Sequence, residues 1–375
     1  MNKYISVKPA LFVFQALLLL LAACNKPVPQ ADSAPAATTA AAQAAPVACV
    51  DEPQISYLCG VINGEDILHL GDTPWLLVSG MNGDLANNPA INGKLHLVNP
   101  AERKFSILFP GDKPVLELNS ELYKSCPGPL DVAKFSVHGI ALKAIDNSPG
   151  HYRLYSTSHG TREAVEVYEI DAAAAPAIKW IGCIPMPATS WTNSLVILKD
   201  WGFLATQFMD PTGSGMDGVT RKEITGQVFE WHPGSEVSRI KGTELSGPNG
   251  IVMSDDERYI YVAAFGTNQV VRFDRSTTPP AKEIIAVTIA PDNLRWTSAG
   301  TIYAAGGNIT DTCGGPVCGT GWSVFEINPA TLSAKRIAGA DEKVALKGVS
   351  SAQEVGKEIW VGTYGGDRLG ILPKP

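Results

Sequence analysis

Short apolar runs separated by polar turns recur along most of the chain. In residues 250–274, Gly-Ile-Val-Met is followed by the polar turn Ser-Asp-Asp-Glu-Arg, by Tyr-Ile-Tyr-Val-Ala-Ala and, after a glycine-containing turn, by Gln-Val-Val-Arg-Phe. β-Branched and aromatic residues dominate these runs, and short runs of this kind bounded by turn residues are typical of β-strands. The segment therefore predicts three successive strands.

The same succession of strands occurs six times. The six units occupy residues 67–98, 139–170, 195–231, 250–274, 294–327 and 349–372. Several continue into a fourth strand, as at 177–181 and 333–337. Short strands repeated every 40 to 60 residues or so, roughly the length of a propeller repeat, are typical of β-propellers. We predict an all-β fold, a single six-bladed β-propeller with four-stranded blades over residues 49–375. A pair of stacked β-sandwiches is the alternative.

The last unit ends at Pro375 after three strands, which would leave the edge of its sheet exposed. Residues 55–62, before the first unit, read Ile-Ser-Tyr-Leu-Cys-Gly-Val-Ile and have the composition of a strand. We predict that this N-terminal strand completes the last blade and closes the ring.

The first residues have the pattern of an export signal. Lys3 and Lys8 precede the apolar run 11–21, which is too short to span a bilayer comfortably. Leu-Ala-Ala-Cys follows and ends at Cys24; it resembles the lipobox of bacterial lipoproteins, whose cysteine carries the lipid anchor. The resemblance implies a lipoprotein signal peptide over residues 1–23. An ordinary signal peptide with a chance cysteine is the alternative.

Residues 24–48 are dominated by Ala, with Pro, Thr, Gln and Ser making up most of the rest. Such a composition cannot bury enough apolar surface to fold, so we expect a flexible tether between the lipidated Cys24 and the propeller. Asn25 resembles an outer-membrane sorting signal. We therefore expect an exported lipoprotein of the bacterial outer membrane, on its periplasmic side or at the cell surface.

Charge and cysteine content narrow the class of protein further. A net charge of −7 argues against a nucleic-acid partner, and we expect a monomer that acts on a small molecule. Apart from Cys24, the cysteines are Cys49, Cys59, Cys126, Cys183, Cys313 and Cys318. An even number in an exported protein predicts disulfides. Cys313 and Cys318 would close a small loop with their own bridge, with a zinc-binding pair as the alternative; the pairing of the other four stays open.

Polar residues stand where the first strand of successive units begins. They are Glu65 with Asp66, His138, Asn193, Asn249, and Asp292 with Asn293. In a propeller the innermost strands begin around one mouth of the central channel, so these side chains should share a site. The second strand of a unit returns to the same mouth, which predicts His159 beside His138. Taken singly, each residue has a structural interpretation; Asn249 and Gly250, for example, form a strong hairpin-turn signal.

Five of these residues offer only oxygen atoms as ligands. They are Glu65, Asn193, Asn249, Asp292 and Asn293, which supply two carboxylates and three amides. Such a set suits a hard cation that takes about six to eight oxygens, and it predicts Ca²⁺. Zinc and copper would favour histidine or cysteine ligands.

Short motifs around the same positions resemble the paraoxonase and arylesterase family of calcium-dependent six-bladed propellers. The motifs are Gly64-Glu65-Asp66, Val137-His138-Gly139-Ile140, Ser158-His159-Gly160, Thr192-Asn193, Pro248-Asn249-Gly250-Ile251 and Pro291-Asp292-Asn293. The resemblance implies hydrolysis of lactones or aryl esters, with a histidine dyad of His138 and His159. The wider gluconolactonase and senescence-marker-protein group shares the propeller and the metal pattern but, as a rule, lacks the two histidines.

Two features depart from the family. Its second, structural calcium would use Asp66, a backbone carbonyl near Ile140 and an aspartate at the position of Ser194, so the loss of that carboxylate should weaken or remove this ion. Its disulfide to the last few residues is also missing, so Cys49 and Cys59 must pair differently.

These observations predict metal-assisted hydrolysis of a lactone or ester. His138 would activate water and His159 would orient it, with Asp292 as the alternative base. No Gly-x-Ser-x-Gly nucleophile motif is present. Two alternatives stay open, a sugar-lactone hydrolase that uses Asp292 and a non-catalytic surface binding module.

Overall fold

The structure is a computed structural model that describes residues 48–83, 92–308, 321–341 and 344–375. The predicted signal peptide, Cys24 and nearly all of the tether lie outside these ranges, as do Cys313 and Cys318. Among the described residues, no helix combines the length and the apolar character needed to cross a membrane.

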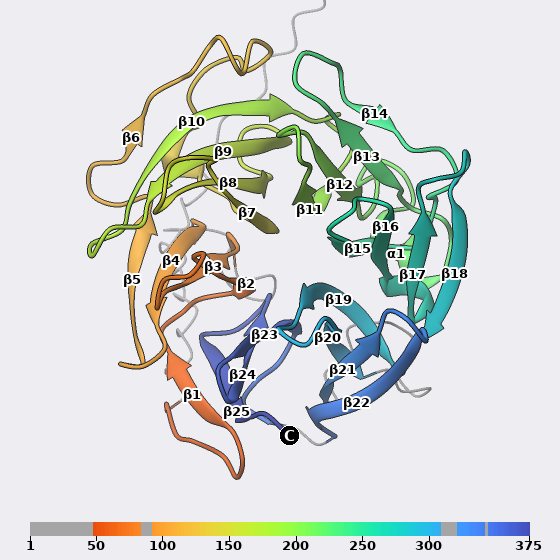
Figure 1. Cartoon of the computed structure of the whole chain (residues 1–375). Helices are drawn as coiled ribbons and strands as arrows, with labels where there is room; N and C mark the ends of the chain where they lie inside the picture. Colours follow the sequence, from red (N-terminus) through yellow and green to blue (C-terminus); the bar gives the residue numbers. More distant parts are fainter. Residues whose placement is uncertain (1–47, 84–91, 309–320, 342–343) are drawn as a thin grey trace, which may run out of the picture. The chain divides into compact units, whose positions relative to one another are not determined.

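Residues 48–375 form the predicted six-bladed β-propeller, with the sheets arranged in a ring (Figure 1). Blade 1 contains β2 (Gly64–His69), β3 (Leu76–Gly80), β4 (Lys94–Asn99) and β5 (Lys104–Phe109). Blade 2 contains β7 (Ile140–Ala144), β8 (His151–Ser158), β9 (Ala164–Asp171) and β10 (Ala177–Pro185). Blade 3 contains β11 (Thr192–Ile197), β12 (Phe203–Gln207), β13 (Val228–Trp231) and β14 (Ser238–Arg239). In these three blades the strands just named run antiparallel in chain order from the first, innermost strand outward.

The second half of the chain repeats this arrangement. Blade 4 contains β15 (Pro248–Met253), β16 (Tyr259–Ala264), β17 (Gln269–Asp274) and β18 (Ala281–Ala286). Blade 5 contains β19 (Ile289–Trp296), β20 (Ile302–Asn308), β21 (Trp322–Asn328) and β22 (Ser333–Ala340). Blade 6 contains β23 (Val349–Val355), β24 (Glu358–Thr363), β25 (Arg368–Pro373) and β1 (Ser56–Cys59). The helical elements are η1 (Val132–Lys134), α1 (Gly215–Thr220) and η2 (Phe265–Thr267).

The N-terminal strand closes the last blade, as predicted. β1 pairs antiparallel with β25, with Ser56 opposite Ile371 and Cys59 opposite Arg368. A disulfide between Cys49 and Cys59 fastens the segment before β1 to the end of that strand. The exposed edge that blade 6 would otherwise present is therefore covered by the chain itself.

Blade 2 differs from the prediction by a fifth strand. The two-residue β6 (Val115–Leu116) runs parallel to the outer edge of β10, next to Lys179 and Trp180. Two residues carry too little periodicity to be recognised in a sequence. The long connection from β6 to β7 contains η1 and leads directly to His138.

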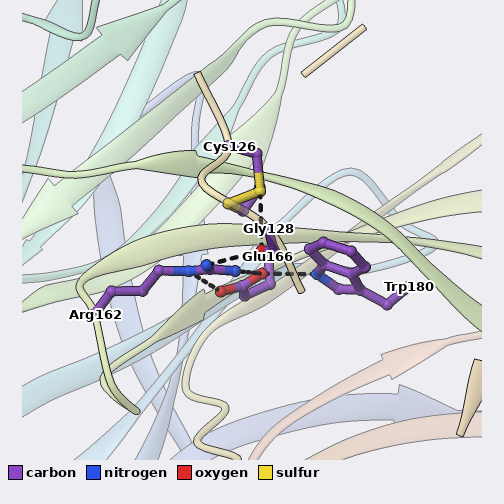
Figure 2. The surroundings of a disulfide bond; sticks show 6 residues. Cys126, Gly128, Arg162, Glu166 and Trp180 are labelled. Carbon is purple, nitrogen blue, oxygen red and sulfur yellow. Dashed lines mark hydrogen bonds and ion pairs between the residues drawn. A yellow bond between two sulfur atoms is a disulfide. The ribbon is translucent and has the colours of Figure 1, made fainter. Parts of the chain in front are cut away.

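A disulfide and a buried ion pair anchor this connection (Figure 2). Cys126 of the connection is bonded to Cys183 of β10. The Glu166 carboxylate, on β9, accepts hydrogen bonds from Arg162 Nε at 2.9 Å and from Trp180 Nε1 at 2.7 Å. Arg162 Nη1 also donates to the backbone oxygen of Gly128, at 2.9 Å. The turn between β8 and β9 is thus fixed to the chain that leads to His138.

Five of the six innermost strands have irregular pairing near their first residues. β2, β11, β15, β19 and β23 each have a shift of register near their first residues, whereas β7 pairs regularly with β8. The shifts fall between Gly64 and Asp66, Thr192 and Leu195, Pro248 and Ile251, Pro291 and Leu294, and Val349 and Ser351. A β-bulge re-aims the side chains within it, and bulges are common next to active sites.

Candidate active site

The bulges carry all five residues that were predicted to bind a cation. Glu65, Asn193, Asn249, Asp292 and Asn293 are each at most 5 % exposed. Asn293 Nδ2 donates to Glu65 Oε1 at 2.5 Å, which joins blade 5 to blade 1. Asn193 Nδ2 lies 3.3 Å from His138 Nε2, which joins blade 3 to the end of the chain segment that enters blade 2.

Each of the five residues has a buried side-chain oxygen without a hydrogen-bond partner in the part of the chain that the structure describes. The atoms are Glu65 Oε2, Asn193 Oδ1, Asn249 Oδ1, Asp292 Oδ1 and Asn293 Oδ1. A buried acceptor without a partner costs about 1–3 kcal/mol, so five of them need a common explanation. A hard cation would satisfy all five.

The mixture of carboxylate and amide oxygens also indicates which kind of cation the site suits. Within the described ranges, no group of three or more His, Cys, Asp or Glu side chains is placed to hold a metal. The five residues do not form such a group because only Glu65 and Asp292 are carboxylates. The site therefore fits a cation that accepts neutral amide oxygens, as calcium does, better than zinc.

The two carboxyl groups are strongly perturbed. Burial raises the pKa of Glu65 well above its usual value, and repulsion from Asp66 and Asp292 adds to this shift. Burial also raises the pKa of Asp292 well above its usual value, although hydrogen bonding with Asn249 acts in the opposite direction. A nearby cation would offset both effects, because it favours the ionised forms.

Hydroxyl groups hold the backbone of three of these residues. We call them the hydroxyl braces; each donates from one blade to a backbone oxygen of the next. The bonds are Thr157 Oγ1 to Asn193 O (2.7 Å), Thr206 Oγ1 to Asn249 O (2.6 Å) and Ser350 Oγ to Glu65 O (2.6 Å). All three hydroxyl-bearing residues are fully buried, so the braces set the spacing of neighbouring inner strands.

Two glycines allow these strands to approach closely. A Cβ atom on Gly139 would lie 2.5 Å from the backbone oxygen of Asn193. A Cβ atom on Gly250 would lie 2.5 Å from the backbone oxygen of Asp292. Asn249 and Gly250 therefore form part of β15 rather than the hairpin turn that their sequence permits. Glycine is required here because another backbone comes close.

The predicted contact between the two histidines is present. His138 Nδ1 lies 3.0 Å from His159 Nε2, and His159 Nδ1 lies 2.7 Å from Glu163 Oε1. The second oxygen of Glu163 accepts the backbone N–H of Thr192 at 3.1 Å. When both imidazole rings are neutral and Glu163 is the acceptor at one end, His159 Nδ1 and then His138 Nδ1 are the donors. His138 Nε2 therefore carries a lone pair toward Asn193 and Glu65.

The environment also keeps His138 neutral. Burial lowers the pKa of His138 well below its usual value, and repulsion from His159 lowers it further. Its Nε2 lies 3.6 Å from Glu65 Oε1. A neutral imidazole whose Nε2 carries no proton, beside a cation site, can accept a proton from a water molecule that takes the place of the 3.3 Å contact with Asn193 Nδ2.

Glu163 was missed by the sequence analysis. Its only sequence signal is an acidic residue four positions after a candidate histidine, on the far side of the turn between β8 and β9. That signal is weak, because a glutamate in a turn is usually exposed.

The residues expected to hold a second calcium lie one or two positions further along the inner strands. Asp66 Oδ2 accepts the backbone N–H of Ile140 at 3.0 Å and forms an ion pair with Arg295. Arg295 also donates to the backbone oxygen of Ile140, at 3.2 Å. The N–H of Ser194 donates to Thr206 Oγ1 at 3.0 Å. The involvement of Arg295 was not predicted.

A cavity among the described residues lies beyond Arg295. It has a volume of about 690 Å³ and is lined by the later residues of the inner strands, from Leu68 and Ile140 to Trp296. Arg295 is part of its wall, whereas none of the five candidate ligands is. The candidate site therefore lies toward the beginnings of the inner strands and the cavity toward their ends.

Comparisons with known proteins extend the description of the fold. The chain matches no protein-family model, and no curated protein sequence matches it. Among solved structures, it resembles a gluconolactonase from Xanthomonas campestris with a TM-score of 0.51 and 16 % identity, over 86 % of this chain and 89 % of that one. It also resembles a luciferin-regenerating enzyme with a TM-score of 0.52 and 14 % identity, over 86 % and 95 % of the two chains. At identities this low, the structural similarity shows a shared fold and nothing more.

Proposed function

We propose that this protein is a calcium-dependent hydrolase of lactones or aryl esters. The observation that carries the proposal is the group of five unpartnered buried oxygens beside the lone pair of a neutral histidine. The fold shared with a gluconolactonase supports lactones as the general class of substrate. The amino-acid sequence adds the proposal that the enzyme is held at the outer membrane by a lipid on Cys24.

Glu65, Asn193, Asn249, Asp292 and Asn293 would hold the calcium ion. The chemistry that a bound calcium ion would supply is polarisation of the substrate carbonyl and stabilisation of the negative charge that forms on its oxygen. The chain supplies the base. His138 Nε2 removes a proton from the attacking water, and the charge that His138 gains is offset through His159 by the carboxylate of Glu163.

A second candidate is a sugar-lactone hydrolase in which Asp292 is the base. The similarity to a gluconolactonase fold favours it, and Asp292 is buried within the same site. The histidine pair would then hold Asn193 in position through the contact between His138 Nε2 and Asn193 Nδ2. The two candidates differ in what His138 contributes to turnover.

The test is turnover of acyl-homoserine lactones, sugar lactones and phenyl acetate by purified protein, before and after removal of calcium. Chelation should abolish activity and added calcium should restore it. His138→Gln should retain calcium and lose about 10²- to 10⁴-fold in kcat for lactones, because it removes only the base. Asn249→Ala should lose calcium affinity and activity together, because it removes a ligand.

Full activity in calcium-free protein would contradict the proposal. Unchanged lactone turnover in His138→Gln would assign the base to Asp292 and favour the second candidate. Calcium binding without turnover of any of the three substrate classes would favour a non-catalytic binding module.

A further inference from the structure

A positively charged side chain lies inside the propeller next to the candidate calcium site. Arg295 belongs to β19, two residues after Asn293, and its side chain is 12 % exposed. Its guanidinium pairs with the Asp66 carboxylate and donates to three backbone oxygens. These are Ile67 O (3.0 Å), Ile140 O (3.2 Å) and Leu294 O (3.0 Å).

The acceptors around Arg295 are those that a bound cation would use. One carboxylate and several backbone carbonyls form an oxygen set typical of a hard metal ion. They come from blade 1 (Asp66, Ile67), blade 2 (Ile140) and blade 5 (Leu294), so whatever binds them joins three blades. A guanidinium suits this position because it has five N–H donors and a permanent charge.

The local charge leaves no place for a divalent ion beside Arg295. Asp66 is the carboxylate that pairs with Arg295, so the charge of Asp66 is already balanced, and Glu65 and Asp292 belong to the candidate calcium site. The neighbouring inner strand has Ser194 where another carboxylate would be needed, and the backbone N–H of Ser194 is bonded to Thr206. A calcium ion at the same oxygens would meet the guanidinium at close range and be repelled. Asp66 Oδ1 and Ser194 Oγ are buried without a hydrogen-bond partner among the described residues. The guanidinium nevertheless occupies Asp66 Oδ2 and the Ile140 oxygen, so a second calcium would share its ligands with a positive charge and does not fit these residues.

We propose that Arg295 is a covalently attached replacement for a second metal ion. It joins blades 1, 2 and 5 below the candidate calcium site, and it leaves the propeller with a single divalent-cation site. This inference concerns metal stoichiometry and stability, so it stands apart from the proposed hydrolysis.

The first measurement counts calcium ions in the wild-type protein. After dialysis against a chelator and then buffer, calorimetric titration should give one strong site per chain. The double variant Arg295→Ala, Ser194→Asp exposes the same oxygens and restores a second carboxylate. It should bind two calcium ions per chain, and its melting temperature should rise more with calcium than that of the wild type.

The matched control is Arg162→Ala. It removes the arginine partner of another buried carboxylate, Glu166, where no comparable set of backbone oxygens is gathered by the guanidinium. This control should lower the melting temperature without adding a calcium site.

Two strong sites in the wild-type protein would overturn the proposal, whether or not the variants fold. A folded double variant that binds no more calcium than the wild type would also overturn it. A wild type without calcium, together with a double variant that binds one ion, would support the role of Arg295 and reject the calcium-dependent hydrolase.

Discussion

Glu163 determines which nitrogen of His138 is available as a base. Its two oxygens have different partners, His159 Nδ1 at 2.7 Å and the Thr192 N–H at 3.1 Å. A backbone N–H can only donate, so the oxygen facing Thr192 is fixed as an acceptor. The oxygen facing His159 is an acceptor only while the side chain is a carboxylate.

Glu163→Gln should reverse the direction of the hydrogen bonds that link residue 163, His159 and His138. The amide oxygen would face Thr192, and the NH₂ group would face His159 Nδ1. His159 Nε2 would then donate to His138 Nδ1, and His138 Nε2 would carry the proton instead of a lone pair. We expect kcat to fall by about 10²- to 10⁴-fold, as for loss of a general base.

The variant should bind calcium with little change, because Glu163 is not among the candidate ligands. Glu169→Gln is the matched control, since Glu169 lies in β9 of the same blade and pairs with Arg153 at 3.0 Å. The control should retain wild-type kcat. An unchanged kcat in Glu163→Gln would show that the histidine tautomers do not matter for turnover.

The inner strands are the elements that bring the candidate ligands together. Their bulges carry the ligands, and the hydroxyl braces fix the bulges at Glu65, Asn193 and Asn249 to the neighbouring blade. Thr206 has a double role, because its hydroxyl donates to Asn249 O at 2.6 Å and accepts the N–H of Ser194 at 3.0 Å. One hydroxyl thus positions the strands that carry two ligands.

Thr206→Val keeps the shape of the side chain and removes this hydroxyl. We expect a loss of about 1–3 kcal/mol in the free energy of unfolding from the unsatisfied backbone groups. Calcium affinity should fall by about 10- to 100-fold, as is typical when the support of a metal ligand is lost. Chemical denaturation and calorimetric titration measure the two effects.

Thr243→Val provides the comparison. Thr243 is as buried as Thr206, and its hydroxyl accepts the Val228 N–H at 3.0 Å and donates to Ile240 O at 2.6 Å, all within blade 3 and its connection to blade 4. It should lose similar stability without losing calcium affinity. Equal calcium affinity in the two variants would mean that the braces serve the fold alone.

At the scale of the whole molecule, the sequence predicts the features that repeat. Six units with the same strand pattern predict the six blades, and the missing strand at the C-terminus predicts the closure by β1. The contact between His138 and His159 follows from strand direction within one blade. The ion pair between Asp66 and Arg295 spans 229 positions and belongs to no repeat, so no local pattern reveals it. The disulfide between Cys126 and Cys183 also joins positions that no repeat relates, so its pairing could not be predicted from a local pattern.

The stability of the whole protein should depend on calcium and pH together. Burial raises the pKa values of Glu65 and Asp292 in the folded protein above their unfolded values of about 4. Metal-free folded protein therefore binds more protons than unfolded protein above this pH, so these two groups destabilise it increasingly as pH rises. Calcium should cancel this loss. We expect the calcium-induced rise in melting temperature to be small near pH 4 and larger near pH 7.

The quantity to compare across pH is the difference in melting temperature between samples with and without calcium. Surface carboxylates such as Asp274, whose pKa is lowered by hydrogen bonds from Arg258 and Ser276, change stability in the opposite direction but equally in both samples. Glu65→Gln should flatten the pH dependence of the difference, because it removes one titrating ligand. A calcium effect that does not change between pH 4 and pH 7 would contradict the assignment of these carboxylates as ligands.

The pairing of β1 with β25 has a consequence for how the chain folds. Residues 56–59 are made before every other strand of the propeller, yet their partners at 368–371 are made after every other strand. Until then, both strands keep unpaired edges, and such edges invite association with other chains. Contacts so distant in sequence form slowly because a long loop must close first. The ring can therefore be completed only by a finished chain, and a chain that stops short of β25 lacks the partner that β1 requires.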